Sequence, residues 1–159
     1  MTFSTPQLRG SHEGGGRRFA IVAASFNQRI VSQLLAAASD CLAGHGVAPD
    51  DIQVVSVPGA WEIPQALEEL AVGGKFDALI ALGAVIRGDT PHFEYICAEC
   101  SGGVARVSSK HRIPVAFGVL TCDTTQQAEE RAGGRGGNKG TEAALAALEM
   151  ASLFGKLRG

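Results

Sequence analysis

The residue best suited to chemistry is His92, which stands at the start of an expected helix directly after a polar loop. The positive end of a helix dipole disfavours a second positive charge, so neutral imidazole can accept a proton there and pass it on. Thr90 and the free backbone N–H groups of the same turn form a site suited to a phosphate group. An isolated histidine more often packs or caps a helix, but this neighbourhood favours acid–base chemistry beside a bound anion.

A strict alternation of apolar runs and helical patterns predicts the elements that position His92. Four apolar runs of strand length lie at residues 19–24, 52–57, 77–86 and 114–120. Helical patterns lie at residues 28–43, 61–71, from 91 onward, 124–132 and 139–154, and Thr90 is the expected N-cap of the third. This alternation is typical of a single-domain, three-layer α/β/α fold around a four-stranded parallel sheet. Residues 1–18 lack such patterns and are expected to form an N-terminal arm before the domain of residues 19–159.

The loops after the strands define the expected cleft, because ligands of open parallel sheets bind outside the carboxyl ends of the strands. These loops are residues 25–27, 58–62, 87–92 and 121–125. Arg131, after the short fourth helix, could grip a phosphate with two hydrogen bonds, or it could simply compensate the helix dipole. The glycine-rich residues 133–140 match neither the P-loop nor the dinucleotide-binding pattern, which argues against an ATPase or a Rossmann dehydrogenase.

Composition excludes several classes of protein. With 45% hydrophobic and 19% charged residues, the chain of 159 residues can bury the core of one domain. A net charge of −2 without a basic run argues against nucleic-acid partners. No apolar stretch is long enough to span a membrane, and no signal-peptide core precedes the first strand. Four cysteines are too few for a disulfide scaffold, so we expect a cytoplasmic protein.

Cys97 and Cys100 form a C-x-x-C pattern, which can indicate redox chemistry or a metal site. Both fall on the apolar stripe of the third helix, and the chain has no second such pair. We therefore expect them to pack as small hydrophobic residues and expect no bound metal.

Several segments together resemble the 6,7-dimethyl-8-ribityllumazine synthase family, in its ordinary class with a histidine-containing loop. The segments are SFN at 25–27, PGAWEIP at 58–64, GAVIRGDTPH at 83–92, GVLTCDTT at 118–125, RAG at 131–133 and GNKG at 137–140. The resemblance runs from about residue 19 to residue 154. It implies a flavodoxin-like fold and a transferase that makes 6,7-dimethyl-8-ribityllumazine, phosphate and water from 5-amino-6-(D-ribitylamino)uracil and 3,4-dihydroxy-2-butanone 4-phosphate. This is the penultimate step of riboflavin biosynthesis, and the family needs no metal or organic cofactor.

The resemblance also implies roles for individual residues. It assigns proton transfer to His92 and phosphate binding to Asp89, Thr90 and Arg131, with Arg131 supplied by a neighbouring subunit. Asp89 would bring an acid to the phosphate, so its backbone N–H is expected to make that contact. The pyrimidine substrate would contact Phe26, Ala60, Trp61, Glu62, Ala84, Val85, Ile86 and a neighbour's Phe117. Trp61 stands where phenylalanine, tyrosine or leucine is commoner. Lys139 and Glu142 are expected as supporting residues.

The resemblance further implies self-association into pentamers, with a 60-subunit icosahedral shell as the expected final assembly and riboflavin synthase as a candidate partner. The kink at residues 131–139 shows no insertion of the kind carried by members with smaller assemblies. The arm is expected to pair with a neighbouring subunit. The rival hypothesis is a flavodoxin-like module that binds a flavin or nucleotide without turnover, and a thiol-redox protein is a distant third.

Overall fold

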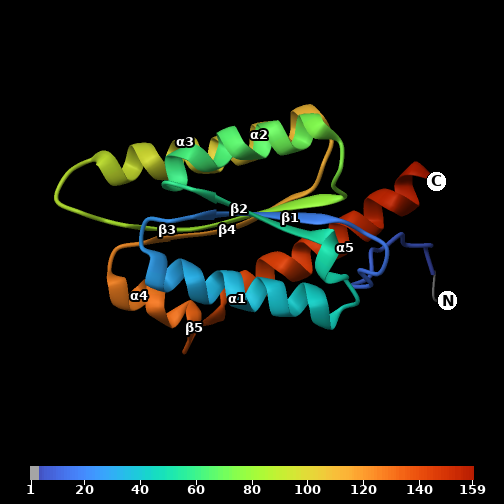
Figure 1. The fold of residues 1–159 in the computed structure, drawn as a ribbon, viewed down its shortest axis with the longest axis horizontal. Helices are drawn as coiled ribbons and strands as arrows, with labels where there is room; N and C mark the ends of the chain where they lie inside the picture. Colours follow the sequence, from blue (N-terminus) through green and yellow to red (C-terminus); the bar gives the residue numbers. More distant parts are fainter. Residues whose placement is uncertain (1–3) are drawn as a thin grey trace.

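A parallel sheet of four strands forms the middle layer of the protein. The computed structural model describes residues 4–159. The sheet has the order β2-β1-β3-β4 and comprises β1 (Phe19–Ala24), β2 (Ile52–Val57), β3 (Ala78–Ile86) and β4 (Val115–Cys122). Figure 1 shows α2 (Ile63–Gly73) and α3 (His92–His111) on one face, and α1 (Gln28–Gly44), α4 (Thr125–Glu130) and α5 (Lys139–Arg158) on the other. The predicted fold class is confirmed.

The core forms on both faces of the sheet because β1 is apolar along its whole length. Ile21 points into the layer that contains Leu34 of α1 and Leu148 of α5. Val22, the next residue, points into the opposite layer with Leu67 of α2. Successive strand residues face opposite sides of the sheet, so a continuous apolar run contributes to the core on both faces. Each such side chain contributes about 1.5–3 kcal/mol through burial.

The strands match the predicted boundaries within two residues, whereas several helices do not. The second helix begins two residues later than predicted, because Ala60–Glu62 form a 3₁₀ turn first. The third begins at His92, since Pro91 adopts a turn conformation, and Thr90 is not its N-cap. The fourth stops at Glu130 and not at residue 132. The last helix continues past residue 154 to Arg158, because Gly155 does not interrupt it.

The glycine-rich kink forms a small antiparallel hairpin that the sequence did not predict. Its strands are β5 (Ala132–Gly134) and β6 (Gly137–Asn138). Gly133 and Gly137 have φ values of 111° and 80°, a region that glycine enters at little cost. Gly140, the second residue of α5, lies so close to α1 that a Cβ at this position would be 2.1 Å from the Leu34 carbonyl oxygen. The path of this segment is therefore compact and depends on positive φ angles at its glycines.

The described part of the arm, residues 4–18, contains no helix or strand and lies against the protein's own α5. The Ser11 backbone N–H donates to Ser152 Oγ at 3.0 Å, and Lys156 Nζ donates to the Arg9 carbonyl at 2.6 Å. Residues 1–3 of the predicted arm lie outside the described residues. Whether the arm also pairs with a second chain stays a prediction.

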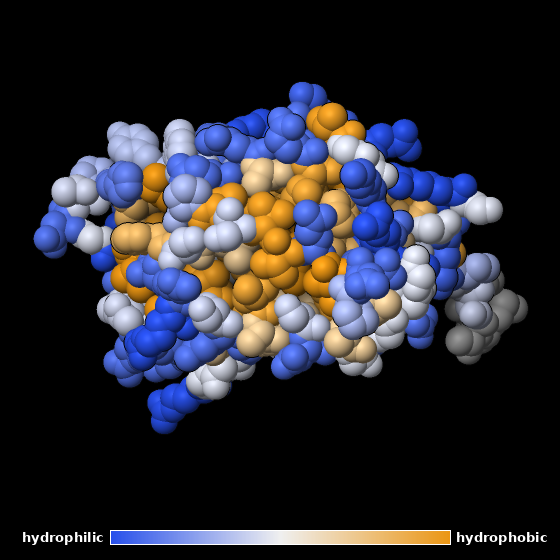
Figure 2. Space-filling model, viewed as in Figure 1, coloured by the Kyte–Doolittle hydropathy of each residue, from blue (hydrophilic) through white to orange (hydrophobic). Residues whose placement is uncertain are grey.

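The edge strand β2 is open to solvent on its outer side. Val54 is 48% exposed there. Figure 2 shows apolar side chains gathered at the centre of the face on which β2 runs in Figure 1. Among the helices of residues 4–159, none is both long and apolar enough to cross a membrane.

Candidate functional site

A cavity of about 820 Å³ opens at the carboxyl end of the sheet, on the face covered by α2 and α3. The chain leaves β1 toward β2 on one side and later returns to β3 on the other side, so the strand order reverses between β1 and β3. Ligand sites of open parallel sheets lie at this kind of reversal. The loops after β1, β2 and β3 and the first turns of α3 line the cavity.

Nine of the residues expected to bind or transform substrate line this one cavity. They are Phe26, Ala60, Trp61, Glu62, Ala84, Val85, Ile86, Thr90 and His92. They come from four separate stretches of the chain, and the carboxyl ends of three adjacent parallel strands bring them together.

Hydrogen bonds of its own loop hold Phe26 at the rim. The Phe26 backbone N–H donates to the Pro58 carbonyl at 3.0 Å, which joins the loops after β1 and β2. Asn27, in the left-handed conformation at φ 60°, donates from Nδ2 to the Ala84 carbonyl at 2.8 Å. The loop is thereby fixed to both neighbouring strands, while the Phe26 ring remains 71% exposed. A rigid, exposed aromatic ring is suited to stacking on a flat heterocycle.

The 3₁₀ turn Ala60–Glu62 forms a further wall of the cavity. The Glu62 backbone N–H donates to the Gly59 carbonyl at 3.1 Å and closes the turn. Trp61 is 47% exposed, whereas Ala60 is buried. This wall therefore offers an aromatic ring, a carboxylate and backbone groups to a ligand.

The start of α3 supplies the polar end of the cavity. His92 is exposed in the first turn, and its backbone N–H lies 3.4 Å from Thr90 Oγ1. The first N–H groups of a helix have no partner within the helix and can bind an anion. His92 and the helix start that was expected to bind an anion thus line the same cavity, and anion binding itself stays a prediction.

The other expected residues lie away from this cavity. Asp89 is exposed between two residues that line it, without lining it itself. Phe117 lines a shallow hollow between α3 and β4. Arg131 caps the end of α4 and donates to the Gln127 carbonyl at 3.0 Å. Lys139 and Glu142 lie 4.0 Å apart at the start of α5. The loop after β4 ends at the same edge of the sheet but does not line the cavity either, so three of the four expected loops form it within a single chain.

Three residues of α3 were missed as cavity residues. Phe93 and Ile96 are half-buried and line the cavity. Tyr95 is 71% exposed at its rim. The available signal was spacing, because residues three and four apart share a helix face and Tyr95 and Ile96 have this relation to His92.

The C-x-x-C pair is placed in a packing environment. Cys100 is completely buried in the layer beneath α2 and α3, and burial raises the pKa of its thiol to about 12. Burial also raises the pKa of the half-buried Cys97. A thiol that resists ionisation is a poor nucleophile, so packing is the better description. Across residues 4–159 no cluster of three or more His, Cys, Asp or Glu side chains is suited to a metal ion.

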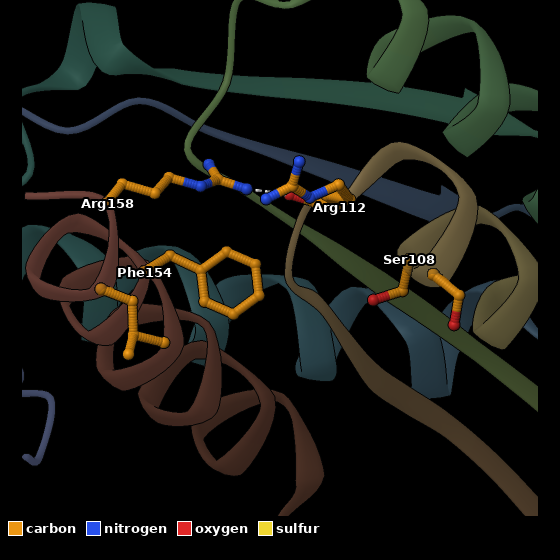
Figure 3. Close-up of a pocket in the computed structure, with 6 residues that line it drawn as sticks. Ser108, Arg112, Phe154 and Arg158 are labelled. Carbon is orange, nitrogen blue, oxygen red and sulfur yellow. Dashed lines mark hydrogen bonds between the residues drawn. The ribbon is translucent and has the colours of Figure 1, made fainter.

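A second hollow, of about 430 Å³, lies at the amino end of the sheet between the ends of α3 and α5. Figure 3 shows Arg158 reaching across it to the carbonyl of Arg112, to which it donates a hydrogen bond. The Arg158 guanidinium carbon also lies 4.9 Å from the centre of the Phe154 ring. These arginines compensate the negative ends of two helices, which explains them without a ligand.

Comparison with known protein families finds one family model that matches most of the chain. The family model described as 6,7-dimethyl-8-ribityllumazine synthase matches residues 16–155. The matched range includes every cavity-lining residue of the carboxyl end.

Proposed function

The chain belongs to the 6,7-dimethyl-8-ribityllumazine synthase family, a family of transferases of riboflavin biosynthesis, and from this we propose its reaction. It condenses 5-amino-6-(D-ribitylamino)uracil with 3,4-dihydroxy-2-butanone 4-phosphate to give 6,7-dimethyl-8-ribityllumazine, phosphate and water. The observation that carries the proposal is the single cavity that gathers Phe26, Glu62, Thr90 and His92. The reaction belongs in the cytoplasm.

The cavity offers each substrate a distinct end. The pyrimidine stacks on Phe26 and is held by backbone groups of Trp61 and Val85, and Glu62 accepts hydrogen bonds from the ribityl hydroxyls. The butanone phosphate binds at the start of α3, to Thr90 and to the Asp89 backbone N–H. This orientation brings the amine of one substrate to the carbonyl of the other, and holding two reactants together accounts for a large part of such catalysis.

His92 moves protons between the steps of the reaction. The amine attacks the carbonyl and water leaves, which forms an imine. Loss of the phosphate, ring closure and a second loss of water follow, and each requires a proton to leave one atom and reach another. His92 lines the same cavity as Thr90 and Phe26, so one imidazole there can serve these transfers.

Arg131 and Phe117 complete the site of a neighbouring chain. Both lie outside the cavity of their own chain, and Arg131 is exposed on the opposite side of the sheet. Lys139 and Glu142 support the same contact from the start of α5. Members of this family self-associate, and we propose that this chain forms pentamers, twelve of which close into a 60-subunit shell. Riboflavin synthase is the candidate partner of that shell.

Mixing the two substrates tests the reaction directly. Purified protein should produce a fluorescent lumazine together with one equivalent of inorganic phosphate, whereas omission of either substrate should abolish both signals. Binding of the pyrimidine without product would instead support the rival binding module.

Mixing two slow variants tests whether neighbouring chains share one site. His92→Ala and Arg131→Ala chains should each be slow alone, and unfolding and refolding them together should restore part of the activity. In the mixed assembly, some sites then combine an intact His92 from one chain with an intact Arg131 from its neighbour. Light scattering gives the assembly: a mass of one chain contradicts both pentamer and shell, and a mass of five or ten chains contradicts only the shell.

A further inference from the structure

We propose that Arg87, which does not line the cavity, is a positioning residue that holds the start of α3, and with it Thr90 and His92, in the reactive arrangement. The inference rests on the proposed function, because it concerns the same site. It assigns a role to a network of side chains that the substrates themselves do not touch.

The Arg87 side chain joins two segments that are distant in the sequence. Its Nε donates to Asp123 Oδ1 at 2.8 Å, in the loop after β4, and its Nη1 donates to Glu94 in the first turn of α3. Its guanidinium carbon lies 4.4 Å from the centre of the Phe93 ring. Phe93 and Glu94 directly follow His92, so the guanidinium holds the turn that carries the histidine.

The far end of this link is itself anchored. The Asp123 backbone N–H donates to Gln127 Oε1 at 2.7 Å. Gln127 and Thr124 form the capping box that begins α4. Arg87 therefore connects the start of α3 with the start of α4, a short helix that ends at Arg131.

The start of α3 needs such an anchor because its own cap is weak. Pro91 stands at the N-cap position and makes no side-chain hydrogen bond to the helix. The contact between Thr90 Oγ1 and the His92 backbone N–H, at 3.4 Å, is long for a hydrogen bond. The contacts of Arg87 with Phe93 and Glu94 supply the fixation that a capping side chain would otherwise provide.

Arg87 also sets the charge beside the proposed phosphate position. Its guanidinium offsets one of the two negative charges of Glu94 and Asp123, and its hydrogen bond to Glu94 holds the pKa of that carboxyl below its usual range. Two unpaired carboxylates in this place would repel a phosphate. The same residue thus affects substrate binding through charge and proton transfer through position.

Three variants separate these effects. Arg87→Met removes both charge and geometry, and Arg87→Lys keeps the charge but cannot reproduce the fork of a guanidinium. The matched control is Arg106→Met, because Arg106 pairs with Glu99 on the exposed surface of α3 two turns further along. Exposed ion pairs contribute little to stability, so all three variants should keep the wild-type fold.

Steady-state kinetics should distinguish the variants. Arg87→Met should lower kcat by roughly 10- to 100-fold, because a misplacement of about 1 Å in a reacting group can have an effect of this size. It should also raise KM for the phosphorylated substrate but not for the pyrimidine. Arg87→Lys should recover KM but not kcat, and Arg106→Met should match the wild type.

Amide hydrogen exchange provides a readout that does not depend on activity. The amides of residues 95–98, which are hydrogen-bonded to the carbonyls at the start of α3, should exchange faster in Arg87→Met than in Arg106→Met. Wild-type kinetics in Arg87→Met, or equal exchange in these two variants, would overturn the proposal. If the wild type makes no lumazine, the proposed function fails, and the exchange comparison alone decides whether Arg87 positions this turn.

Discussion

Two hollows lie at opposite ends of the sheet, and the same helix, α3, borders both. At the carboxyl end α3 begins, and its first turn with His92 borders a cavity of about 820 Å³ that exposed aromatic side chains also line. At the amino end α3 finishes beside the end of α5, and the smaller hollow there is lined by Arg112, Arg158 and Phe154. Both ends therefore combine aromatic and polar side chains.

The direction of the helix explains why only the carboxyl end is suited to an anionic ligand. The start of a helix attracts an anion, whereas the end of a helix repels one and is stabilised by cations. At the amino end the protein supplies those cations itself, since Arg158 donates to the carbonyl of Arg112. At the carboxyl end the positive potential is left for a ligand. A cavity's chemistry thus depends on which helix ends face it as well as on which residue types line it.

The largest expected effect comes from His92→Ala at the carboxyl end. Turnover should fall by about 10²- to 10⁴-fold, because a positioned acid–base group typically contributes this much. Substrate binding should survive, which a direct titration of the pyrimidine would show. His12→Ala in the arm is the control and should turn over like the wild type. A His92→Ala enzyme within about threefold of wild type would contradict the role of the imidazole.

A smaller effect is expected for the aromatic rings, and here the two hollows can be compared directly. Phe26→Ala should weaken pyrimidine binding by about 1–3 kcal/mol, the range measured for bases that stack on aromatic side chains. Phe154→Ala, at the amino end, should leave pyrimidine affinity unchanged although it removes a half-buried ring. Calorimetric titration of both variants makes the comparison. Equal losses of affinity would mean that the ligand does not distinguish the two ends.

Removal of the self-supplied cation should affect stability but not catalysis. Arg158→Ala leaves the Arg112 carbonyl without its donor, so the melting temperature should decrease slightly. Turnover should stay within about twofold, because distant sites act nearly independently. Thermal unfolding and the fluorescence assay would be run on the same sample. A large loss of turnover with an unchanged melting temperature would give the amino end a catalytic role.

The smallest expected effect concerns Glu68, which faces the end of α3. Its Oε1 lies 2.9 Å from His111 Nε2 and 3.2 Å from Lys110 Nζ, and the close contact with His111 is the main cause that lowers the pKa of Glu68. A carboxyl pKa that is lower in the folded state stabilises the protein above the unfolded pKa, and this contribution disappears as the pH falls through the folded value. Glu68→Gln should therefore melt slightly below the wild type at neutral pH and equally in strong acid. A difference in melting temperature between the two proteins that is the same at every pH, or no difference at any pH, would contradict this.

The sequence predicted β1 and β3 well because strands buried on both faces need continuous apolar runs, and the residues at 19–24 and 78–86 allow few alternatives. The capping box of α4 also follows from local sequence, since Thr124 and Gln127 have the required types and spacing. Helix ends were less accurate. The start at His92 depends on the conformation of Pro91, and the length of α5 depends on a glycine that the helix tolerates.

By itself the sequence determined the layers of the fold and the loops that carry reactive side chains, because local periodicity decides which segments are strands and where each strand ends. Only the tertiary structure decided which of those loops meet. The order β2-β1-β3-β4 puts the loop after β4 at the far edge from β2, and α4 then carries Arg131 to the opposite side of the sheet. Strand order and the face that each helix covers result from long-range packing, so neither the three-loop cavity nor the Arg87 network could be read from spacing alone.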